Sequence, residues 1–241
     1  MKTAGIIIIG NEILSGKVTD INSPYLCQEL RPLGVEVKQI ITIPDIPEII
    51  GRTVVDFSER FTWVFTSGGI GPTHDDITVA SIAKGFGIEL FESPLIMKVI
   101  RNYQGDKMTS AHRRMAMIPE GSELIEYAEG RGPQLQFRNI FVFPGIPEFL
   151  KIRFSAIKER FRTTPIVLKQ IYLKADEGVI AESLDATQEA FPELMLGSYP
   201  KVAGSDYDVK LTLECRDSTY LEKAFDFLYE RLPEKCVLRI E

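Results

Sequence analysis

The sequence predicts an α/β protein, in which a three-layer domain around a mostly parallel sheet precedes a smaller α+β domain. Two observations support this prediction. Apolar runs typical of buried strands end three times in a glycine loop that opens a helix, at Gly10, Gly68–Gly71 and Gly145. Further along the chain the pattern changes to strand, helix, two strands and helix. We therefore place the first domain at residues 1–164 and the second at residues 165–241.

The composition is typical of a soluble acidic protein. The 241 residues carry a formal net charge of −6, and 44% of them are hydrophobic, which is enough for a sizeable core. No basic run indicates a nucleic-acid footprint, so we expect no nucleic-acid partner. The apolar block Ile6–Ile9 is too short for a signal peptide or a membrane span. Cys27, Cys215 and Cys236 lie far apart, which favours reduced thiols and a cytoplasmic location.

Strands and helices alternate along the first domain. Each expected strand is a short apolar or alternating run, and each expected helix has apolar residues at helical spacing with Pro or Gly at its ends. The expected strands are Gly5–Ile9, Val35–Ile43, the run around Trp63–Phe65, Glu89–Phe91, Ser122–Tyr127, Gln134–Phe137 and Ile140–Phe143. The expected helices begin near Pro24, Pro47, Val79, Pro94 and Glu148, and Pro32 should distort the end of the first.

The second domain and one polar segment complete the chain. We expect strands at Ile166–Ala175, Leu194–Tyr199 and Asp208–Glu214, and helices at Gly178–Phe191 and Ser218–Leu232. Residues 105–117 are polar and contain the run His112-Arg113-Arg114. Arginine suits phosphate through its planar fork, and a mobile surface loop is an equally good interpretation.

The segment Gly68–Thr78 carries the main functional signal. Its glycines let the backbone turn tightly and approach a ligand, and the helix that follows favours an anion. Asp75 and Asp76 would repel a bare phosphate, so a divalent cation between them and the phosphate is expected. The alternative is a tight turn in which Asp76 is the helix N-cap. Neither a dinucleotide fingerprint, which would need Gly where His74 stands, nor a Walker loop is present.

Two further acidic residues follow predicted strands. Glu12 stands between two glycines just after the first strand, and Asp45 follows the second. Because parallel strands end at one edge of a sheet, both carboxylates would approach the glycine loops there. The simpler interpretations are a solvated loop glutamate and a turn or N-cap aspartate. Together, the three loops predict a phosphate-bearing ligand at that edge.

Three motifs resemble one known family. They are Gly10–Leu14, Thr66–Thr78 and Phe143–Glu148, and they are similar to the molybdopterin-binding (MoaB/MogA-like) fold. The variant resembles CinA-related proteins and, most closely, the N-terminal domain of eukaryotic FAD synthase, which Leu26-Cys27, Gly197–Pro200 and Val209–Leu213 also fit. The resemblance covers essentially the whole chain.

The resemblance implies chemistry on a phosphoanhydride. The FAD synthase domain is associated with FAD hydrolysis, and CinA relatives with ADP-ribose pyrophosphatase activity. Both depend on a divalent cation such as cobalt and are helped by potassium, and family members are commonly dimers or trimers. Molybdenum-cofactor members instead bind molybdopterin, through aspartates that match Asp76 and, less closely, Asp45, while Glu12 matches a CinA glutamate. The sequence holds neither the CinA deamidase nor the FAD synthase adenylyltransferase domain, so neither activity is expected.

The resulting hypothesis is a metal-dependent nucleotide pyrophosphatase. Glu12, Asp75 and Asp76 would hold Mg²⁺, Mn²⁺ or Co²⁺, with Asp45 as a further catalytic residue. The loops would bind the nucleotide through Gly10, Asn11, Thr66, Gly68, Gly69, Gly71, Pro72, Thr73, Thr78, Gly145 and Pro147. Two alternatives use the same pocket: a molybdopterin- or pterin-binding protein, and a catalytically silent binding module.

Overall fold

The structure is a computed structural model, which describes residues 2–128, 132–201, 206–233 and 235–241. The chain divides into two compact units, Met1–Thr163 and Thr164–Glu241. Each unit has its own hydrophobic core. Within the described ranges, no helix combines the length and the apolar character needed to span a membrane.

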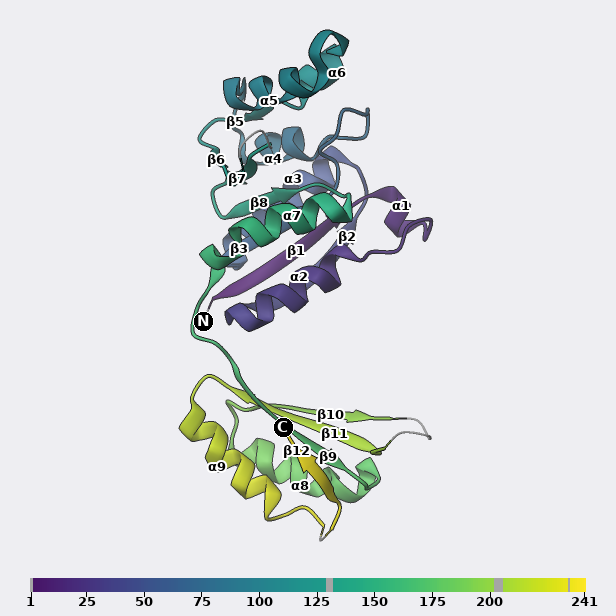
Figure 1. The fold of residues 1–241 in the computed structure, drawn as a ribbon, viewed down its shortest axis with the longest axis vertical. Helices are drawn as coiled ribbons and strands as arrows, with labels where there is room; N and C mark the ends of the chain where they lie inside the picture. The colour runs from purple at the N-terminus through teal and green to yellow at the C-terminus, as the bar shows by residue number, and fades with distance from the viewer. Residues whose placement is uncertain (1, 129–131, 202–205, 234) are drawn as a thin grey trace. The chain divides into compact units, whose positions relative to one another are not determined.

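The first unit is built on a six-stranded sheet with the strand order β2-β1-β3-β8-β7-β6 (Figure 1). The first four strands in this order are parallel, and β7 and β6 are antiparallel at one edge. Their bounds are β1 Thr3–Ile9, β2 Glu36–Ile43, β3 Trp63–Ser67, β6 Glu123–Ile125, β7 Gln134–Phe137 and β8 Ile140–Phe143. The predicted mostly parallel α/β fold is therefore confirmed.

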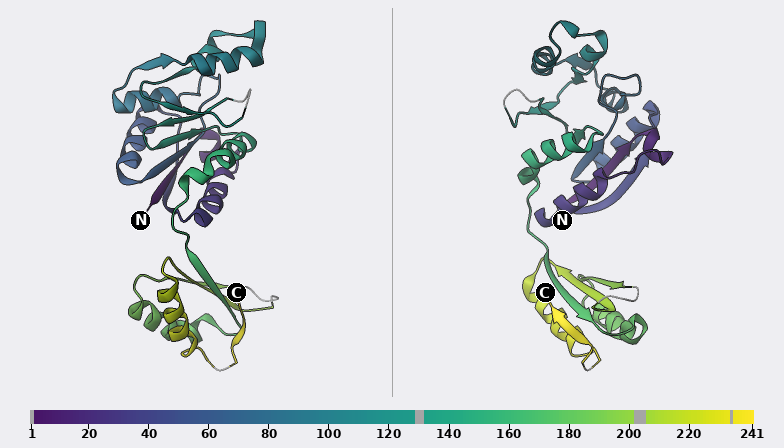
Figure 2. Two further views of the ribbon diagram at one scale, coloured as in Figure 1. Left: turned by 60° about the vertical axis from the view of Figure 1, so that its left-hand side comes forward. Right: turned by 45° about the vertical axis from the view of Figure 1, so that its right-hand side comes forward.

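Helices cover both faces of this sheet (Figures 1 and 2). The face that carries Ile8 and Phe65 packs against α2 and α7, and the face that carries Ile7 and Val64 packs against α3 and α4. Neighbouring residues of a strand point to opposite faces, so one apolar run serves both layers. The helix bounds are α2 Asn22–Leu30, α3 Pro47–Arg60, α4 Thr78–Phe86 and α7 Pro147–Ile157.

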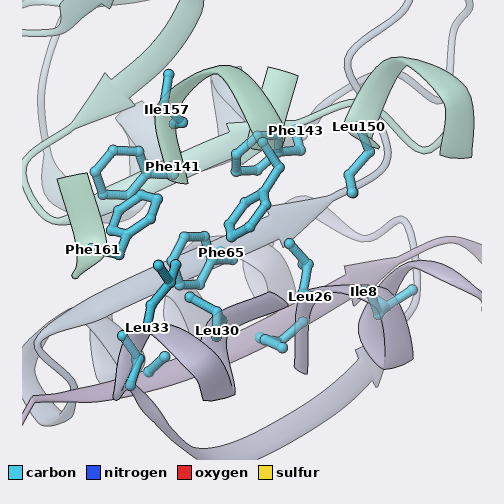
Figure 3. Close-up of a cluster of buried hydrophobic side chains, with 14 residues drawn as sticks. Ile8, Leu26, Leu30, Leu33, Phe65, Phe141, Phe143, Leu150, Ile157 and Phe161 are labelled. Carbon is cyan, nitrogen blue, oxygen red and sulfur yellow. The ribbon is translucent and has the colours of Figure 1, made fainter. Parts of the chain in front are cut away.

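An aromatic cluster fills the layer between the sheet and the helices α2 and α7. Phe65 lies at its centre, with Phe141 and Phe161 on one side and Leu30 on the other (Figure 3). The rings of Phe65 and Phe161 meet edge to face with centroids 5.0 Å apart, a favoured geometry for aromatic pairs. This packing fixes β3 and β8 against each other, and both strands lead into glycine loops.

Several short elements were not predicted. The tetrapeptide α1 (Asn11–Leu14) is helical, and β5 (Met117–Pro119) pairs with β4 (Leu90–Glu92) in a separate two-stranded sheet. The polar segment that follows α5 (Pro94–Gln104) is not a plain loop, because it holds the 3₁₀ turn η2 (Gly105–Lys107) and the helix α6 (Ser110–Arg114). The remaining 3₁₀ turns are η1 Arg31–Leu33, where Pro32 ends the regular helix as predicted, and η3 Lys158–Phe161.

The second unit is a four-stranded antiparallel sheet with the order β10-β11-β9-β12. Helices α8 and α9 lie on one face of it (Figure 2), where Ile180 and Leu221 meet Ile171 and Leu211. The bounds are β9 Val167–Leu173, α8 Glu177–Ala190, β10 Met195–Pro200, β11 Val209–Cys215, α9 Ser218–Tyr229 and β12 Val237–Ile240. The smaller α+β domain is confirmed, and β12 is a strand that the sequence pattern did not reveal.

Candidate functional site

The carboxyl ends of β1, β3 and β8 lie side by side. Ile8 pairs with Ser67, and Ser67 pairs with Phe143, so the glycine loops that follow these strands share one edge. Asn22 joins two of them, because its Nδ2 donates to Ser67 Oγ at 2.9 Å and to the carbonyl of Gly145 at 2.8 Å. Asn22 is therefore a structural connection between the loops.

Two glycines shape the loop after β3. Gly68 has a φ of +114°, and a Cβ there would collide with the carbonyl oxygen of Ile9. Gly69 has a φ of +65°, and a Cβ there would collide with Thr78 Oγ1. Buried Thr78 closes the turn, since its Oγ1 donates to the carbonyl of Gly68 at 2.9 Å and its N–H donates to that of Gly69 at 3.0 Å. Thr66 is also fully buried, so neither threonine faces a ligand directly.

The acidic pair gathers around Thr73. Its N–H donates to Asp76 Oδ2 at 2.7 Å, and its Oγ1 lies 2.5 Å from both Asp76 Oδ2 and Asp75 Oδ1. One hydroxyl proton serves two carboxylates, so this oxygen cluster retains a strong preference for positive charge. The hydrogen bond from Thr73 is the main reason that the pKa of Asp75 is lowered.

The interpretation of Asp76 as a helix N-cap is wrong. The helix α4 begins at Thr78, its N-cap position is Ile77, and no side chain caps it. The Asp76 carboxylate turns back to Thr73 instead, and a Cβ on Gly71 would lie only 2.6 Å from Asp76 Oδ2. Gly71 thus leaves room for the carboxylate, which explains a glycine at this place in the loop.

Glu12 and Asp45 take other places at the sheet edge. The exposed Glu12 lies on α1 with its carboxylate above Gly10, in space that a Cβ would fill. Asp45 Oδ2 accepts a hydrogen bond from the N–H of Asn11 at 2.8 Å and so holds the start of α1. In the described part of the chain, no three His, Cys, Asp or Glu side chains are grouped to hold a metal ion. The protein alone therefore does not assemble Glu12 with the pair Asp75 and Asp76.

A cavity of about 810 Å³ opens beside the glycine loop. Of the predicted site residues, four line it: Gly69, Gly71, Thr73 and Asp76. The remainder stand outside its wall: Gly10, Asn11, Glu12, Asp45, Thr66, Gly68, Pro72, Asp75, Thr78, Gly145 and Pro147. Most of the wall is apolar, with contributions from α4, α5, β7, β8 and α7. The arrangement places a polar, acidic loop at the border of an apolar chamber.

The polar segment after α5 also reaches this cavity. His112 and Arg114 of α6 line the wall, and Arg114 Nη2 lies 3.4 Å from the carbonyl oxygen of Pro72. Arg113 turns away and pairs with Glu92 at 2.5 Å. Of the two interpretations of this segment, contact with the ligand cavity is the one that its position favours.

Sequence reasoning missed the contribution of α7. Phe149, Ile152 and Arg153 line the cavity, whereas Leu150 and Phe154 of the same helix are buried in the core. The signal was available, because residues three and four apart share a helix face and 149, 152 and 153 form such a set beside the core stripe.

These observations define a three-layer α/β protein with a cavity beside the loop that follows β3. A family model described as "Probable molybdopterin binding domain" matches residues 5–163, and one described as "FAD synthase, middle domain" matches residues 165–241. The chain therefore belongs to the molybdopterin-binding domain family, and its second unit is similar to the FAD synthase middle domain. The resemblance to MoaB/MogA-like, CinA-related and FAD synthase proteins is confirmed.

Several relatives share most of this chain. A protein of Archaeoglobus fulgidus is 34% identical over 95% of this chain and 98% of its own length. A "Probable FAD synthase" of Caenorhabditis briggsae is 31% identical over 92% of this chain but 48% of its own length. A "CinA-like protein" of Cytophaga hutchinsonii is 31% identical over 87% of this chain and 53% of its own length. The chain thus spans about half of the FAD synthase and CinA-like relatives.

One solved structure supports the fold of the first unit. A crystal structure of CinA from Thermoplasma acidophilum, described as of unknown function, aligns with a TM-score of 0.62 and 29% sequence identity. It covers 67% of this chain and 100% of the other.

Proposed function

We propose that this protein is a metal-dependent nucleotide pyrophosphatase, which hydrolyses the phosphoanhydride of a dinucleotide such as FAD or ADP-ribose. One observation carries the proposal: Gly71, Thr73 and Asp76 border a cavity of about 810 Å³ whose remaining wall is mainly apolar. That volume lies within the roughly 300–1,000 Å³ of ligand sites. A dinucleotide has a charged middle and planar rings at its ends, which matches this division. The chain also matches about half the length of a probable FAD synthase, which is consistent with a nucleotide substrate.

The available metal donors are oxygens. Asp75 Oδ1, Asp76 Oδ2 and Thr73 Oγ1 lie together, and hard divalent cations such as Mg²⁺ and Mn²⁺ prefer such ligands. These residues would hold the cation together with phosphate oxygens of the substrate, because Mg²⁺ is commonly bound by one or two carboxylates plus phosphates. When bound, a divalent cation would polarise the phosphates and lower the pKa of a bound water. The proposal also includes Co²⁺ as a possible metal and K⁺ as an ion that helps activity. It further includes assembly of the chain into a homodimer or homotrimer.

The chain's own groups would bind and orient the phosphates. Gly69 and Gly71 expose backbone at the cavity. From α6, Arg114 approaches the Pro72 carbonyl of the same loop, and His112 lines the same cavity. An arginine beside the phosphates would offset the negative charge that Asp76 adds. The apolar wall would keep bulk water away from the phosphates, apart from the water molecule that attacks, and would so strengthen these interactions.

A hydrolysis screen tests the proposal. The purified chain would be offered FAD, ADP-ribose, NAD and diadenosine polyphosphates with Mg²⁺, Mn²⁺ or Co²⁺, with and without K⁺. Asp76→Asn should lower turnover by about 100-fold or more. Mutation of residues that only hydrogen-bond to a metal's ligands already lowers activity by roughly 10–100-fold, and Asp76 would be a ligand itself. Asp56→Asn is the matched control, because Asp56 is an exposed carboxylate on α3 that pairs with Arg60. Full activity of Asp76→Asn would refute the assignment.

A second candidate is a molybdopterin- or pterin-binding protein. The family match and the apolar cavity favour it, because a planar pterin with a phosphate fits the same two environments. Pterin fluorescence that co-purifies with the chain, without cleavage of any dinucleotide, would decide for this function. If the chain binds neither a nucleotide nor a pterin in the presence of a divalent cation, that result would favour a catalytically silent binding module.

A further inference from the structure

Arg153 is a cation in the wall of the cavity that the proposed phosphate chemistry does not use. It lies on α7, half-buried, and Tyr127 lines the same cavity. Burial lowers the pKa of the Arg153 guanidinium, and the Tyr127 hydroxyl opposes this shift. A guanidinium stays charged in proteins and carries five N–H donors in a planar fork, so Arg153 can donate to a ligand in the cavity that it lines.

Arg153 and Asp76 enter the cavity wall from different elements. Arg153 comes from α7, which packs on the Phe65 face of the sheet, whereas Asp76 precedes α4, which packs on the opposite face. Their neighbours differ as well: Asp76 lies against Gly71 and Thr73, and Arg153 Nη2 lies 3.5 Å from the position of a Cβ on Gly132. The cavity wall therefore carries two polar groups of opposite charge, each with its own neighbours.

Much of the cavity wall that Arg153 belongs to is made of apolar side chains. Val99, Leu135 and Ile152 line the cavity, together with the rings of Tyr103 and Phe149. Such walls accommodate the faces of a flat ring, and a charged donor at the margin meets the ring's edge. A second phosphate would lose its hydration in these surroundings, which disfavours it.

We propose that Arg153, with Tyr127 beside it, binds the carbonyl edge of a planar ring in the ligand and determines specificity at the end of the cavity away from Asp76. Arginine offers donors alone, so it pairs with an edge that presents adjacent acceptors, as it does with the O6 and N7 atoms of guanine. Flavin and pterin rings carry carbonyl oxygens next to ring nitrogens. The six-membered ring of adenine mixes a donor with an acceptor and fits less well. This inference rests on the proposed function for the phosphate end, and it selects keto-bearing rings.

Riboflavin is the direct probe, because it carries the ring and has no phosphate. Its binding would be followed by flavin fluorescence with the full chain, and inorganic pyrophosphate binding with Mg²⁺ by calorimetry. Arg153→Met should weaken riboflavin binding by about 10-fold or more, the scale of a charge-assisted hydrogen bond, and leave pyrophosphate binding within about twofold. Lys151→Met is the matched control, because Lys151 lies on the same helix over the Tyr25 ring and away from the cavity.

Arg153→Lys keeps the charge and removes the planar fork, so it should lie between wild type and Arg153→Met. If Arg153→Met does not fold, the riboflavin affinity of Arg153→Lys alone tests the role of Arg153. Wild-type protein that binds no riboflavin, or an Arg153 variant that weakens riboflavin and pyrophosphate equally, would overturn the inference. The outcome is separable from the proposed function, since riboflavin binding needs no turnover and hydrolysis of ADP-ribose needs no flavin ring.

Discussion

At the scale of the residue, Gly68 holds the glycine loop against β1. Its φ of +114° lies in a region that side chains rarely adopt, and a Cβ would meet the backbone carbonyl of Ile9, which has no flexible end to move. Position 68 therefore requires glycine for two reasons: the positive φ and the lack of space for a Cβ. The loop that carries Thr73 and Asp76 to the cavity depends on it.

We expect Gly68→Ala to destabilise the first unit by about 3 kcal/mol or more, because strain and a backbone clash add. Gly87→Ala is the matched control: Gly87 has a φ of +65° with open space around it, so its cost should be about 1–2 kcal/mol. Urea unfolding followed by Trp63 fluorescence measures both. Equal costs for the two variants would mean that the loop relaxes around the added methyl group.

At the scale of the element, α6 shows how a short helix positions side chains at a cavity. Thr109 accepts a hydrogen bond from the N–H of His112, and the His112 ring in turn lies 3.2 Å from the N–H of Thr109. This capping box stabilises five residues that have little intrinsic tendency to stay helical alone. It orders the wall that includes Arg114.

Thr109→Ala should cost α6 about 1 kcal/mol, the usual value of an N-cap. Amide exchange across residues 110–116 should then speed up by roughly a factor of five, since about 1.4 kcal/mol corresponds to a factor of ten. Thr109→Ser, which keeps the hydroxyl, is the control. Unchanged exchange in Thr109→Ala would show that the pairing of Arg113 with Glu92, and not the cap, orders this segment.

At the scale of the whole molecule, two units with separate cores should unfold separately. Leu221 is fully buried in the core of the second unit, and the single tryptophan, Trp63, belongs to the first. Leu221→Ala should destabilise the second unit by about 2–5 kcal/mol, the usual cost of such a cavity. We expect an earlier loss of circular dichroism with an unshifted Trp63 fluorescence transition. A joint shift of both signals would show that the units unfold as one.

Much of the fold followed from local patterns. The strands around Ile6–Ile9 and Ile140–Phe143 were predictable because a buried parallel strand is a continuous apolar run. By contrast, β12 and β5 were missed. The four residues of β12 are mostly exposed and β5 has only three residues, so neither shows a clear periodicity. The glycine loop was found because backbone demands leave a direct trace in the sequence.

The sequence by itself determined the α/β class, the glycine loops and the acidic pair, because hydrophobic period and glycine placement are local properties of the chain. Only the tertiary structure decided which of these residues meet. Packing turned Asp45 to Asn11, left Glu12 over Gly10 and brought α6 and the second face of α7 to the cavity of Asp76. These contacts join segments that are far apart in the sequence, some of them on opposite faces of one sheet. Their geometry depends on how the layers pack, and a local pattern of residues holds no information about that packing.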